Sequence, residues 1–271
     1  MPDTTLPEPS ATIRSKGRTT ASGSSEKTDT IRKLHFVLQG KGGVGKTVAA
    51  LMLSQCIEEK GEPVICVDTD PVNASLSSLS SMNPERVSIF AGKKVDTRSL
   101  DLFTEKLLTE DAHFVVDNGA SSFVPVSQYL IENDVAGMMT EAGRQPVVHV
   151  VVTGGPAMLD TMKGLASIVR DFPPSVRVVV WLNEYFGPIV NASGKPFEEL
   201  PAYTDSKDRI FAVVRLLMLS EEATSDLRDM LSRRLTFTQA LAPENTDILR
   251  VQKSRLFKIR LAVWPQIERA V

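Results

Sequence analysis

The sequence is short of cysteine and lacks any long apolar segment. Its two cysteines, Cys56 and Cys66, lie inside apolar runs and not at the spacing of metal ligands. A disulfide scaffold and a cysteine-based zinc site are therefore excluded, and two buried thiols in the reducing cytoplasm are the simplest interpretation. No window approaches the roughly 18 uninterrupted apolar residues of a transmembrane helix, so we expect a cytoplasmic protein without one.

An excess of one charge is also missing. The chain has 271 residues with 31 Lys and Arg against 33 Asp and Glu, which gives a formal net charge of −2. This balance argues against a globally basic nucleic-acid binder but leaves local patches open. Hydrophobic residues at 42% and charged residues at 24% are ordinary for a globular protein, so a wholly disordered or collagen-like chain is excluded.

The first 30 residues lack the large apolar side chains that a folded core requires. The stretch 1–30 is rich in Ser and Thr and shows no hydrophobic periodicity. Such a segment cannot bury enough apolar surface to offset its ordering entropy, so we expect a disordered N-terminal arm. Residues 31–271 are then expected to form one domain with a helical C-terminal segment.

Short apolar runs alternate with helical patterns from residue 34 onward. The runs predict strands at 34–38, 63–67, 114–116, 147–152 and 176–182. Helical spacing predicts helices at 47–59 and 156–169, and about three further pieces from Ser220 to the end. The polar segment 184–208 is expected to be a long surface loop. Together these patterns predict an α/β fold, with a mostly parallel sheet and helices on both faces.

Polar motifs fall at the carboxyl ends of the predicted strands. They are Gly40–Thr47, Asp68–Pro71, Asp117–Ser122, Thr153–Pro156 and Asn183. In open α/β sheets, ligands bind at the edge formed by the carboxyl ends of the strands. We therefore expect these motifs to contribute to one site.

The segment 40–47 matches the phosphate-binding pattern G-x-x-x-x-G-K-[ST] and lies between a predicted strand and a predicted helix. Its glycines let successive backbone N–H groups point into one concavity, to which the helix N-terminus adds its positive end. Lys46 is placed to reach the β- and γ-phosphates, and the Thr47 hydroxyl to bind Mg²⁺. The predicted nucleotide-binding residues of this segment are Gly40, Lys41, Gly42, Gly43, Val44, Gly45, Lys46, Thr47 and Val48.

A second lysine, Lys41, lies inside the same loop. Lys46 already serves the phosphates of its own chain, so Lys41 is either a solvated surface residue or has another role. In the functional interpretation, Lys41 projects outward and reaches a phosphate bound by a facing copy. Two nucleotides would then hold a homodimer together.

Three aspartates follow predicted strands and are candidates for metal and water chemistry. Asp117 is expected to hold Mg²⁺ through water together with Thr47, and Asp68 to help complete the shell. Asp70 is our choice for positioning the attacking water. The alternative is that these aspartates only cap helices or turns after the strands.

Asn183 ends the predicted strand at 176–182. Its amide has both a donor and an acceptor and could pair with the edge of an adenine. The alternative is an ordinary turn asparagine. With this residue, the sequence predicts ATP and Mg²⁺ as the bound cofactors.

The motif set resembles the deviant Walker A ATPases of the ParA/MinD superfamily. The segments 41–47 and 68–71, together with Asp117, match that superfamily's order and spacing. The resemblance implies slow ATP hydrolysis and ATP-sandwich dimers in which a signature lysine, here Lys41, contacts the partner's nucleotide. By this resemblance Lys41, Lys46 and Asp70 would be the catalytic residues.

A narrower resemblance is to TraL-type conjugal-transfer proteins of plasmids, and it covers roughly Leu34 to Val263. The segments that carry it are 37–46, 68–74, 116–125, 151–155, 180–183 and 235–241. It implies partners among the other conjugal-transfer proteins. Partition ATPases usually carry Gln where this chain has Val72 and Pro-Pro where it has Asn118-Gly119. Efficient hydrolysis is therefore not implied, and a nucleotide-binding adaptor and a DNA-positioning ATPase stay open beside the switch ATPase.

The C-terminal segment is basic and amphipathic. Its cations are Arg250, Lys253, Arg255, Lys258 and Arg260, and its apolar stripe is Leu249, Leu256, Ile259, Val263 and Ile267. Three interpretations compete: a terminal helix packed on the domain, a surface for DNA, and a surface for membranes. Pro265 is expected to interrupt a single long helix here, which weakens the membrane interpretation.

Overall fold

The computed structural model describes residues 31–70, 83–92 and 94–271. The predicted arm 1–30 and residues 71–74 of the second motif lie outside the described residues. The described residues all belong to one compact unit, which extends from Ile31 to Val271.

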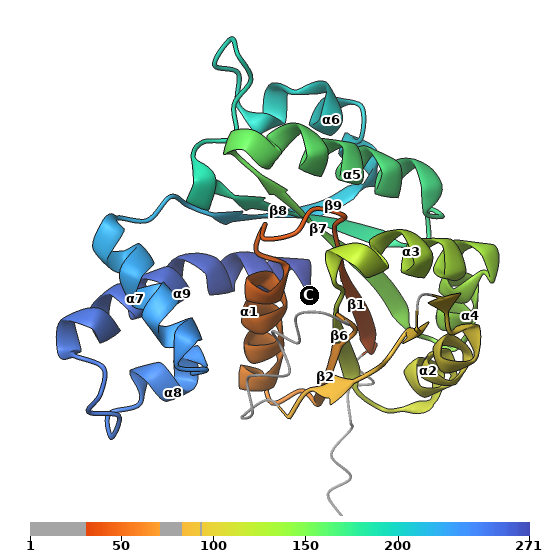
Figure 1. Cartoon of the computed structure of the whole chain (residues 1–271), viewed down its shortest axis with the longest axis horizontal. Coiled ribbons are helices and arrows are strands. Elements are labelled where there is room, and N and C mark those ends of the chain that lie inside the picture. Colours follow the sequence, from red (N-terminus) through yellow and green to blue (C-terminus); the bar gives the residue numbers. More distant parts are fainter. Residues whose placement is uncertain (1–30, 71–82, 93) are drawn as a thin grey trace, which may run out of the picture. The chain divides into compact units, whose positions relative to one another are not determined.

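A seven-stranded sheet forms the centre of this unit, within the described ranges, in the order β3-β2-β6-β1-β7-β8-β9 (Figure 1). The strands are β1 (Lys33–Leu38), β2 (Val64–Asp68), β3 (Glu85–Arg86), β6 (His113–Asp117), β7 (Gln145–Thr153), β8 (Arg177–Asn183) and β9 (Ile210–Leu216). Neighbouring strands pair in parallel throughout. A separate antiparallel pair joins β4 (Phe90–Ala91) to β5 (Lys94–Val95). The predicted mostly parallel sheet is thus confirmed.

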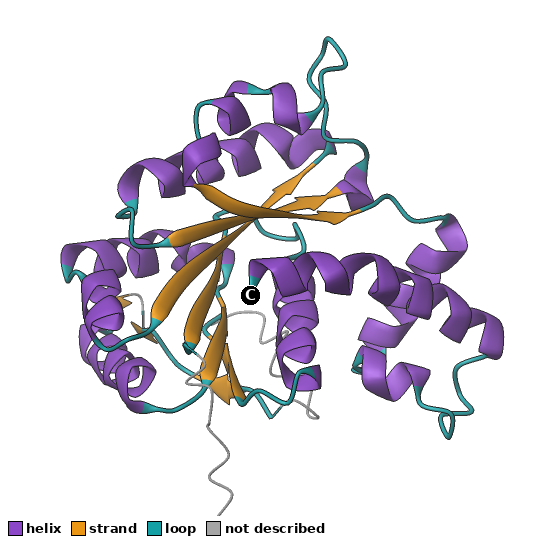
Figure 2. Cartoon of the chain, turned by 180° about the vertical axis from the view of Figure 1, so that it is seen from behind, coloured by secondary structure: helices purple, strands orange, loops and turns teal. Residues whose placement is uncertain are grey.

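Helices cover both faces of the sheet (Figure 2). One face carries α2 (Thr97–Thr109), α3 (Phe123–Glu132), α4 (Val135–Glu141), α5 (Met158–Asp171) and α6 (Pro201–Thr204). The other carries α1 (Lys46–Glu59), α7 (Glu221–Ser232), α8 (Phe237–Leu241) and α9 (Arg250–Ala270). Strand side chains alternate between the two layers, as Val115 and Val116 of β6 illustrate. This two-faced burial explains why the strands read as continuous apolar runs.

The predicted long loop at 184–208 is only partly correct. It contains η4 (Glu184–Phe186), η5 (Phe197–Glu199) and α6, followed by η6 (Lys207–Arg209). The side chains of Ile189, Phe197 and Leu200 are buried in the core, and Phe197 is 1% exposed. Sparse apolar residues in a polar segment thus anchor short turns, which periodicity does not detect.

Pro265 does not interrupt the last helix, contrary to the prediction. α9 continues through it to Ala270. Proline removes one backbone donor and crowds the carbonyl four residues earlier. That carbonyl belongs to Leu261, and both Leu261 and Pro265 are exposed residues of the helix. The helix therefore tolerates Pro265 on its outer side.

All three histidines of the chain are buried in the sheet, on β1, β6 and β7. The indole Nε1–H of Trp181 donates to Nδ1 of His149 at 2.9 Å, and Nε2 of His149 lies 2.9 Å from Nδ1 of His35. The backbone N–H of Lys33 donates to Nδ1 of His113 at 3.1 Å. Neutral rings with these contacts carry their hydrogen on Nε2. In His35 and His113 that buried nitrogen has no partner among the described residues.

Both cysteines are free and buried, as the sequence predicts. Burial raises the pKa of the Cys56 and Cys66 thiols to about 11. At neutral pH these thiols are protonated and unreactive, since the thiolate is the nucleophile.

Candidate functional site

The glycine-rich loop leaves β1 and ends at the first turn of α1. Gly43 and Gly45 have φ angles of 73° and 101°, in the left-handed region that favours glycine. Gly45 is the N-cap of α1, and its helix has no side-chain cap. The first backbone N–H groups of α1 are therefore open to an anion, as a phosphate loop requires.

Lys46 lies on the inner side of this loop and is 8% exposed. Its ammonium donates to the carbonyl of Lys41 at 3.0 Å. Burial lowers the pKa of Lys46, whereas the nearby carboxylates of Asp117 and Asp70 raise it. A buried cation beside carboxylates is poised to accept the negative charge of a phosphate group.

Lys41 points the other way, as the sequence predicts for a projecting lysine. Its side chain is 46% exposed and its ammonium lies 3.0 Å from a carboxylate oxygen of Asp160. Asp160 belongs to the first turn of α5. The two lysines of the loop thus differ: Lys46 is buried on the inner side of the loop, whereas Lys41 is half exposed at the surface.

The hydroxyl of Thr47 donates to the Asp117 carboxylate at 2.6 Å, so the structure brings together two of the three predicted metal ligands. Burial raises the pKa of Asp117 to about 7, while its hydrogen bond to Thr47 acts in the opposite direction. The second oxygen of Asp117 is buried and has no hydrogen-bond partner among the described residues. A hydroxyl, a buried carboxylate and an unused oxygen fit a hard cation such as Mg²⁺.

Asp68 and Asp70 lie beside this pair. Asp68 is fully buried at the end of β2 and is in register with Asp117 of β6. One carboxylate oxygen of Asp68 accepts the backbone N–H of Asp70 at 3.0 Å. The Asp70 side chain packs on the backbone of Gly119, where an added Cβ would lie 2.6 Å from the Asp70 carboxyl carbon. The three predicted aspartates therefore gather at one edge of the sheet.

Asn183 ties the glycine-rich loop to the end of β8. Its side-chain NH₂ donates to the Val44 carbonyl at 2.9 Å, and its side-chain oxygen accepts the Tyr185 backbone N–H at 3.2 Å. An amide has two N–H hydrogens and two acceptor lone pairs, so one of each is left for a base. The predicted role at adenine stays a prediction, to which the structure adds a role in holding the loop.

Replacing Asn183 by Ala separates these two roles. The variant loses the hydrogen bond from the Asn183 side chain to the Val44 carbonyl. Losing a buried hydrogen bond costs about 1–3 kcal/mol, so we expect about tenfold weaker nucleotide binding. If the amide also selects the base, the loss is larger for ATP than for GTP. Fluorescence titration with both labelled nucleotides measures this, with Asn191→Ala in a distant loop as control. Unchanged affinity for both nucleotides would contradict both the role in holding the loop and the role at the base.

A cavity of about 640 Å³ opens beside the loop, lined by parts of α1, η4, the β9–α7 connection, α7 and α9. Val48, the last residue of the predicted nucleotide-binding segment, is among its lining residues together with Gly43, Gly45 and Asn183. Sequence reasoning missed this cavity. No local signal could have found it, because its walls are more than 200 residues apart in the chain at their extremes.

The apolar stripe of the C-terminal segment packs on the domain. Leu256, Ile259, Val263 and Ile267 of α9 are buried, whereas Leu249 is 67% exposed. These residues join the core on the α1 face of the sheet. Among the described helices, none is long and apolar enough to cross a membrane.

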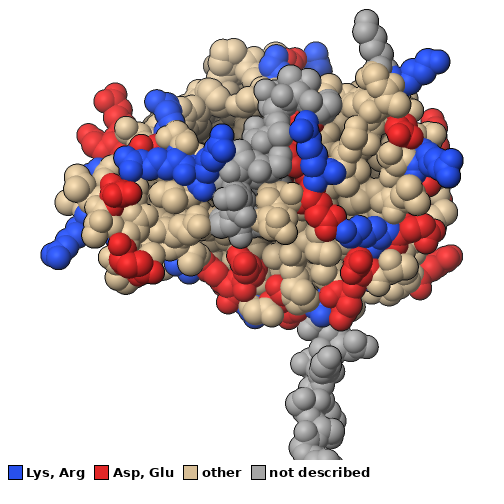
Figure 3. Space-filling model, turned by 60° about the horizontal axis from the view of Figure 1, so that its bottom comes forward, with Lys and Arg blue, Asp and Glu red and all other residues tan. Residues whose placement is uncertain are grey.

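Three of the five basic side chains of this segment contact acceptors within the chain. Arg255 forms an ion pair with Asp226, Arg260 forms one with Glu59, and Lys253 donates a hydrogen bond to the carbonyl of Ala242. On the face shown in Figure 3, Lys and Arg side chains are interspersed with Asp and Glu side chains. These contacts favour the interpretation of a packed terminal helix, and binding to DNA or a membrane stays a prediction.

A glycine-rich loop opening a helix, a buried lysine and a hydroxyl–carboxylate pair at the carboxyl edge of a parallel sheet define a P-loop nucleotide-binding protein. The model of the CobQ/CobB/MinD/ParA nucleotide binding domain matches residues 35–234. The chain belongs to this family, and the predicted ParA/MinD-like fold is confirmed.

Within the family, the chain is similar to two proteins of Escherichia coli, each named Protein TraL. They are 44% and 43% identical to it over 239 residues, which is 88% of this chain and 98% of each relative. The resemblance to TraL-type conjugal-transfer proteins is thereby confirmed.

Solved structures of the superfamily share the fold. The MinC:MinD cell division protein complex of Aquifex aeolicus matches with a TM-score of 0.50 and 12% identity, over 84% of this chain and 95% of that one. The ParA family ATPase of Chlorobium tepidum matches with a TM-score of 0.50 and 13% identity, over 85% of this chain and 98% of that one. At these identities the likeness concerns the fold alone.

Proposed function

We propose that the protein is an ATP-binding, slowly hydrolysing switch ATPase of a plasmid conjugal-transfer system. The observation that carries the proposal is the 2.6 Å hydrogen bond between Thr47 and Asp117, beside the buried Lys46. It holds a hydroxyl and a carboxylate where a β/γ-phosphate pair and a hard cation would meet. Membership of the nucleotide-binding family and similarity to Protein TraL support the assignment.

We assign three roles to the residues of the site: phosphate binding, Mg²⁺ binding and orientation of the attacking water. Lys46 and the loop N–H groups would bind the phosphates, and Thr47, Asp117 and Asp68 would hold Mg²⁺. When bound, Mg²⁺ supplies charge neutralisation on the phosphate oxygens. Asp70 would orient the attacking water. The close packing of Asp70 on Gly119 supports this role, since it joins the two loops that would flank the γ-phosphate.

Asp70→Ala tests the switch. The variant keeps the phosphate loop but loses the group that would orient water, so we expect ATP to drive it into a stable dimer. Light scattering with saturating ATP and Mg²⁺ should give twice the monomer mass, with Lys46→Ala as the negative control. A variant that stays monomeric at saturating ATP would remove the sandwich dimer from the proposal.

Lys41 is the residue proposed to cross to the partner's nucleotide in such a dimer. In this structure its ammonium is paired with Asp160, and both side chains are about half exposed. To reach a phosphate of another chain, Lys41 has to leave this partner. Asp160 would then oppose dimerisation.

Asp160→Asn should therefore ease ATP-dependent dimerisation. At low ionic strength we expect the ATP concentration at half-dimerisation to fall by about two- to fivefold, and the difference to vanish at high salt, because exposed ion pairs are weak and screened. Asp171→Asn, at the other end of α5 and paired with Arg170, is the matched control. An Asp160→Asn variant that dimerises less readily than wild type would show that Asp160 supports the dimer.

A nucleotide-binding adaptor without turnover is the second candidate, because Asn118 stands where partition ATPases usually carry proline. Phosphate release over hours, compared with Lys46→Ala, decides between the two. Release above the variant's background supports the ATPase, and equal release supports the adaptor. ATP-dependent retention on non-specific DNA that falls steeply with salt would instead favour a DNA-positioning role.

A further inference from the structure

The cavity beside the loop is larger and more apolar than phosphate binding requires. Its volume of about 640 Å³ lies within the range of small-molecule sites, roughly 300–1,000 Å³. Residues from α1, the β9–α7 connection, α7 and α9 form its walls. The cavity thus extends from the sheet edge along helices of one layer.

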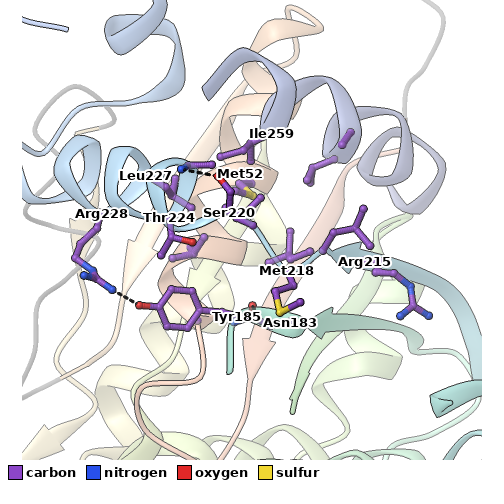
Figure 4. Close-up of a pocket in the computed structure, with 18 of the residues that line it drawn as sticks. Met52, Asn183, Tyr185, Arg215, Met218, Ser220, Thr224, Leu227, Arg228 and Ile259 are labelled. Atoms are coloured by element: carbon purple, nitrogen blue, oxygen red, sulfur yellow. Dashed lines mark hydrogen bonds between the residues drawn. The ribbon is translucent and has the colours of Figure 1, made fainter. Parts of the chain in front are cut away.

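Figure 4 shows that the cavity has two ends. Asn183, Tyr185 and Met218 lie at the end next to the glycine-rich loop, where a nucleotide base would be bound. Met52, Leu227 and Ile259 lie together at the other end. Met52 is six residues beyond Lys46 in α1, about 9 Å along the helix axis. The far end therefore lies well beyond the loop that would hold the phosphates.

The far end offers apolar walls to its occupant. Met52, Leu227 and Ile259, which lie together there, come from α1, α7 and α9, and the lining of the whole cavity also includes Leu231 and Val263. Apolar surface of this kind gains free energy when an apolar group replaces water against it. A polar or multiply charged ligand would lose its hydration without gaining hydrogen bonds.

One cation at this cavity is unpaired. Lys258 of α9 lines the cavity and has no ion pair or hydrogen bond among the described residues. The other cations that line the cavity are engaged: Arg255 pairs with Asp226, Arg215 pairs with two glutamates, and Arg228 donates to the hydroxyl of Tyr185. Among the residues that the structure describes, Lys258 is thus the one lining cation without a partner, and it lies beside apolar walls.

We propose that the cavity between α1, α7 and α9 binds a second ligand, an apolar chain that carries a single anionic head group. The chain occupies the end formed by Met52, Leu227 and Ile259, and the head group pairs with Lys258. This site is distinct from the nucleotide phosphates and does not depend on hydrolysis.

The test compares decanoate with decanol, which share a chain and differ in charge. Isothermal titration calorimetry on the full chain should give saturable one-to-one binding of decanoate. Lys258→Glu should weaken decanoate binding at least about tenfold and leave decanol binding within about twofold, since only the charged contact is reversed. Arg250→Glu, on the same helix but outside the cavity, should change neither. Leu227→Trp, which fills the far end, should abolish both.

Three results would overturn the proposal. They are no saturable binding of either probe, equal loss of both probes in Lys258→Glu, and one-for-one displacement of decanoate by AMP, which would make the cavity a base site only. If Leu227→Trp does not fold, the decanoate–decanol comparison in Lys258→Glu decides alone. Lys46→Ala should keep decanoate binding, so failure of nucleotide binding and failure of this site are distinguishable.

Discussion

Replacing Lys46 by Ala is expected to weaken ATP binding at least about 100-fold. Lys46 is buried on the inner side of the glycine-rich loop, where only 8% of the residue is exposed. Hydrogen bonds between charged partners contribute about 1.5–3 kcal/mol each, and this lysine is placed to make them with two phosphate groups. A loss of about 3–4 kcal/mol corresponds to a factor of roughly 100 to 1,000 in the dissociation constant.

The variant should fold normally. Burial already disfavours the charged form of Lys46 and lowers its pKa, so the unliganded protein gives up little when the ammonium is removed. Among the described residues, its ammonium donates to the Lys41 carbonyl within the same loop. We therefore expect the thermal midpoint without nucleotide to stay within a few degrees of wild type, whereas the ATP-induced increase disappears.

Lys41→Ala is the matched control, since it removes the same functional group from the same loop. Its side chain is 46% exposed and its partner is Asp160, so ATP binding to the single chain should stay within about threefold of wild type. Dimerisation with ATP should be lost instead. Equilibrium titration with a fluorescent ATP analogue, together with light scattering, separates the two effects. Equal affinities in Lys46→Ala and wild type would exclude the loop as the phosphate site.

The site residues could be predicted because they belong to local motifs at strand ends. Thr47 and Asp117 are 70 residues apart, yet the pattern of parallel strands alone indicates that their strands end at one edge. The hydrogen bond between them confirms that prediction. Asp68 could be placed for the same reason, since parallel pairing puts it in register with Asp117.

Contacts that depend on side-chain conformation could not be predicted. The ion pair of Lys41 with Asp160 and the hydrogen bond of Asn183 to Val44 join residues 119 and 139 positions apart. Strand order predicts which segments are neighbours, but it does not predict the side-chain rotamers that decide which hydrogen bonds and ion pairs form. β9 (Ile210–Leu216) escaped prediction although nine of the ten residues 210–219 are apolar, because periodicity does not tell a buried strand from a buried helix in such a run. The buried anchors of 184–208 escaped because single apolar residues in polar surroundings carry no periodicity.

Acid is expected to destabilise the protein strongly between pH 7 and pH 5, through its buried histidines. Burial lowers the pKa of His149 to about 3 and that of His113 to about 4, and it holds the pKa of His35 well below its ordinary value. In the unfolded chain each ring titrates near pH 6.5. Below that pH the unfolded state binds protons that the folded state excludes, so the free energy of unfolding falls as the pH falls.

The expected loss is large because three groups act in the same direction. Between pH 7 and pH 5 each histidine removes about 2 kcal/mol, or about 6 kcal/mol together. Asp117 opposes this, because its folded-state pKa of about 7 lies above that of an unfolded aspartate and the folded protein takes up its proton first. Its contribution of about 2 kcal/mol leaves a net loss of about 4 kcal/mol, a large share of the stability of an ordinary domain.

Urea unfolding at pH 7, 6 and 5 and constant ionic strength measures this loss. His113→Gln is the informative variant, since glutamine can still accept the Lys33 backbone N–H but does not titrate. It should reduce the loss of unfolding free energy between pH 7 and pH 5 by about 2 kcal/mol, the contribution of one histidine.

The chain has only three histidines, so their ring resonances can be followed individually by NMR. All three should stay neutral in the folded protein down to pH 5, because protonation would place an uncompensated charge inside the sheet. If a ring titrates near pH 6.5 in the folded state, that histidine does not contribute to the predicted fall in the free energy of unfolding. Such a result would also show that water reaches the ring.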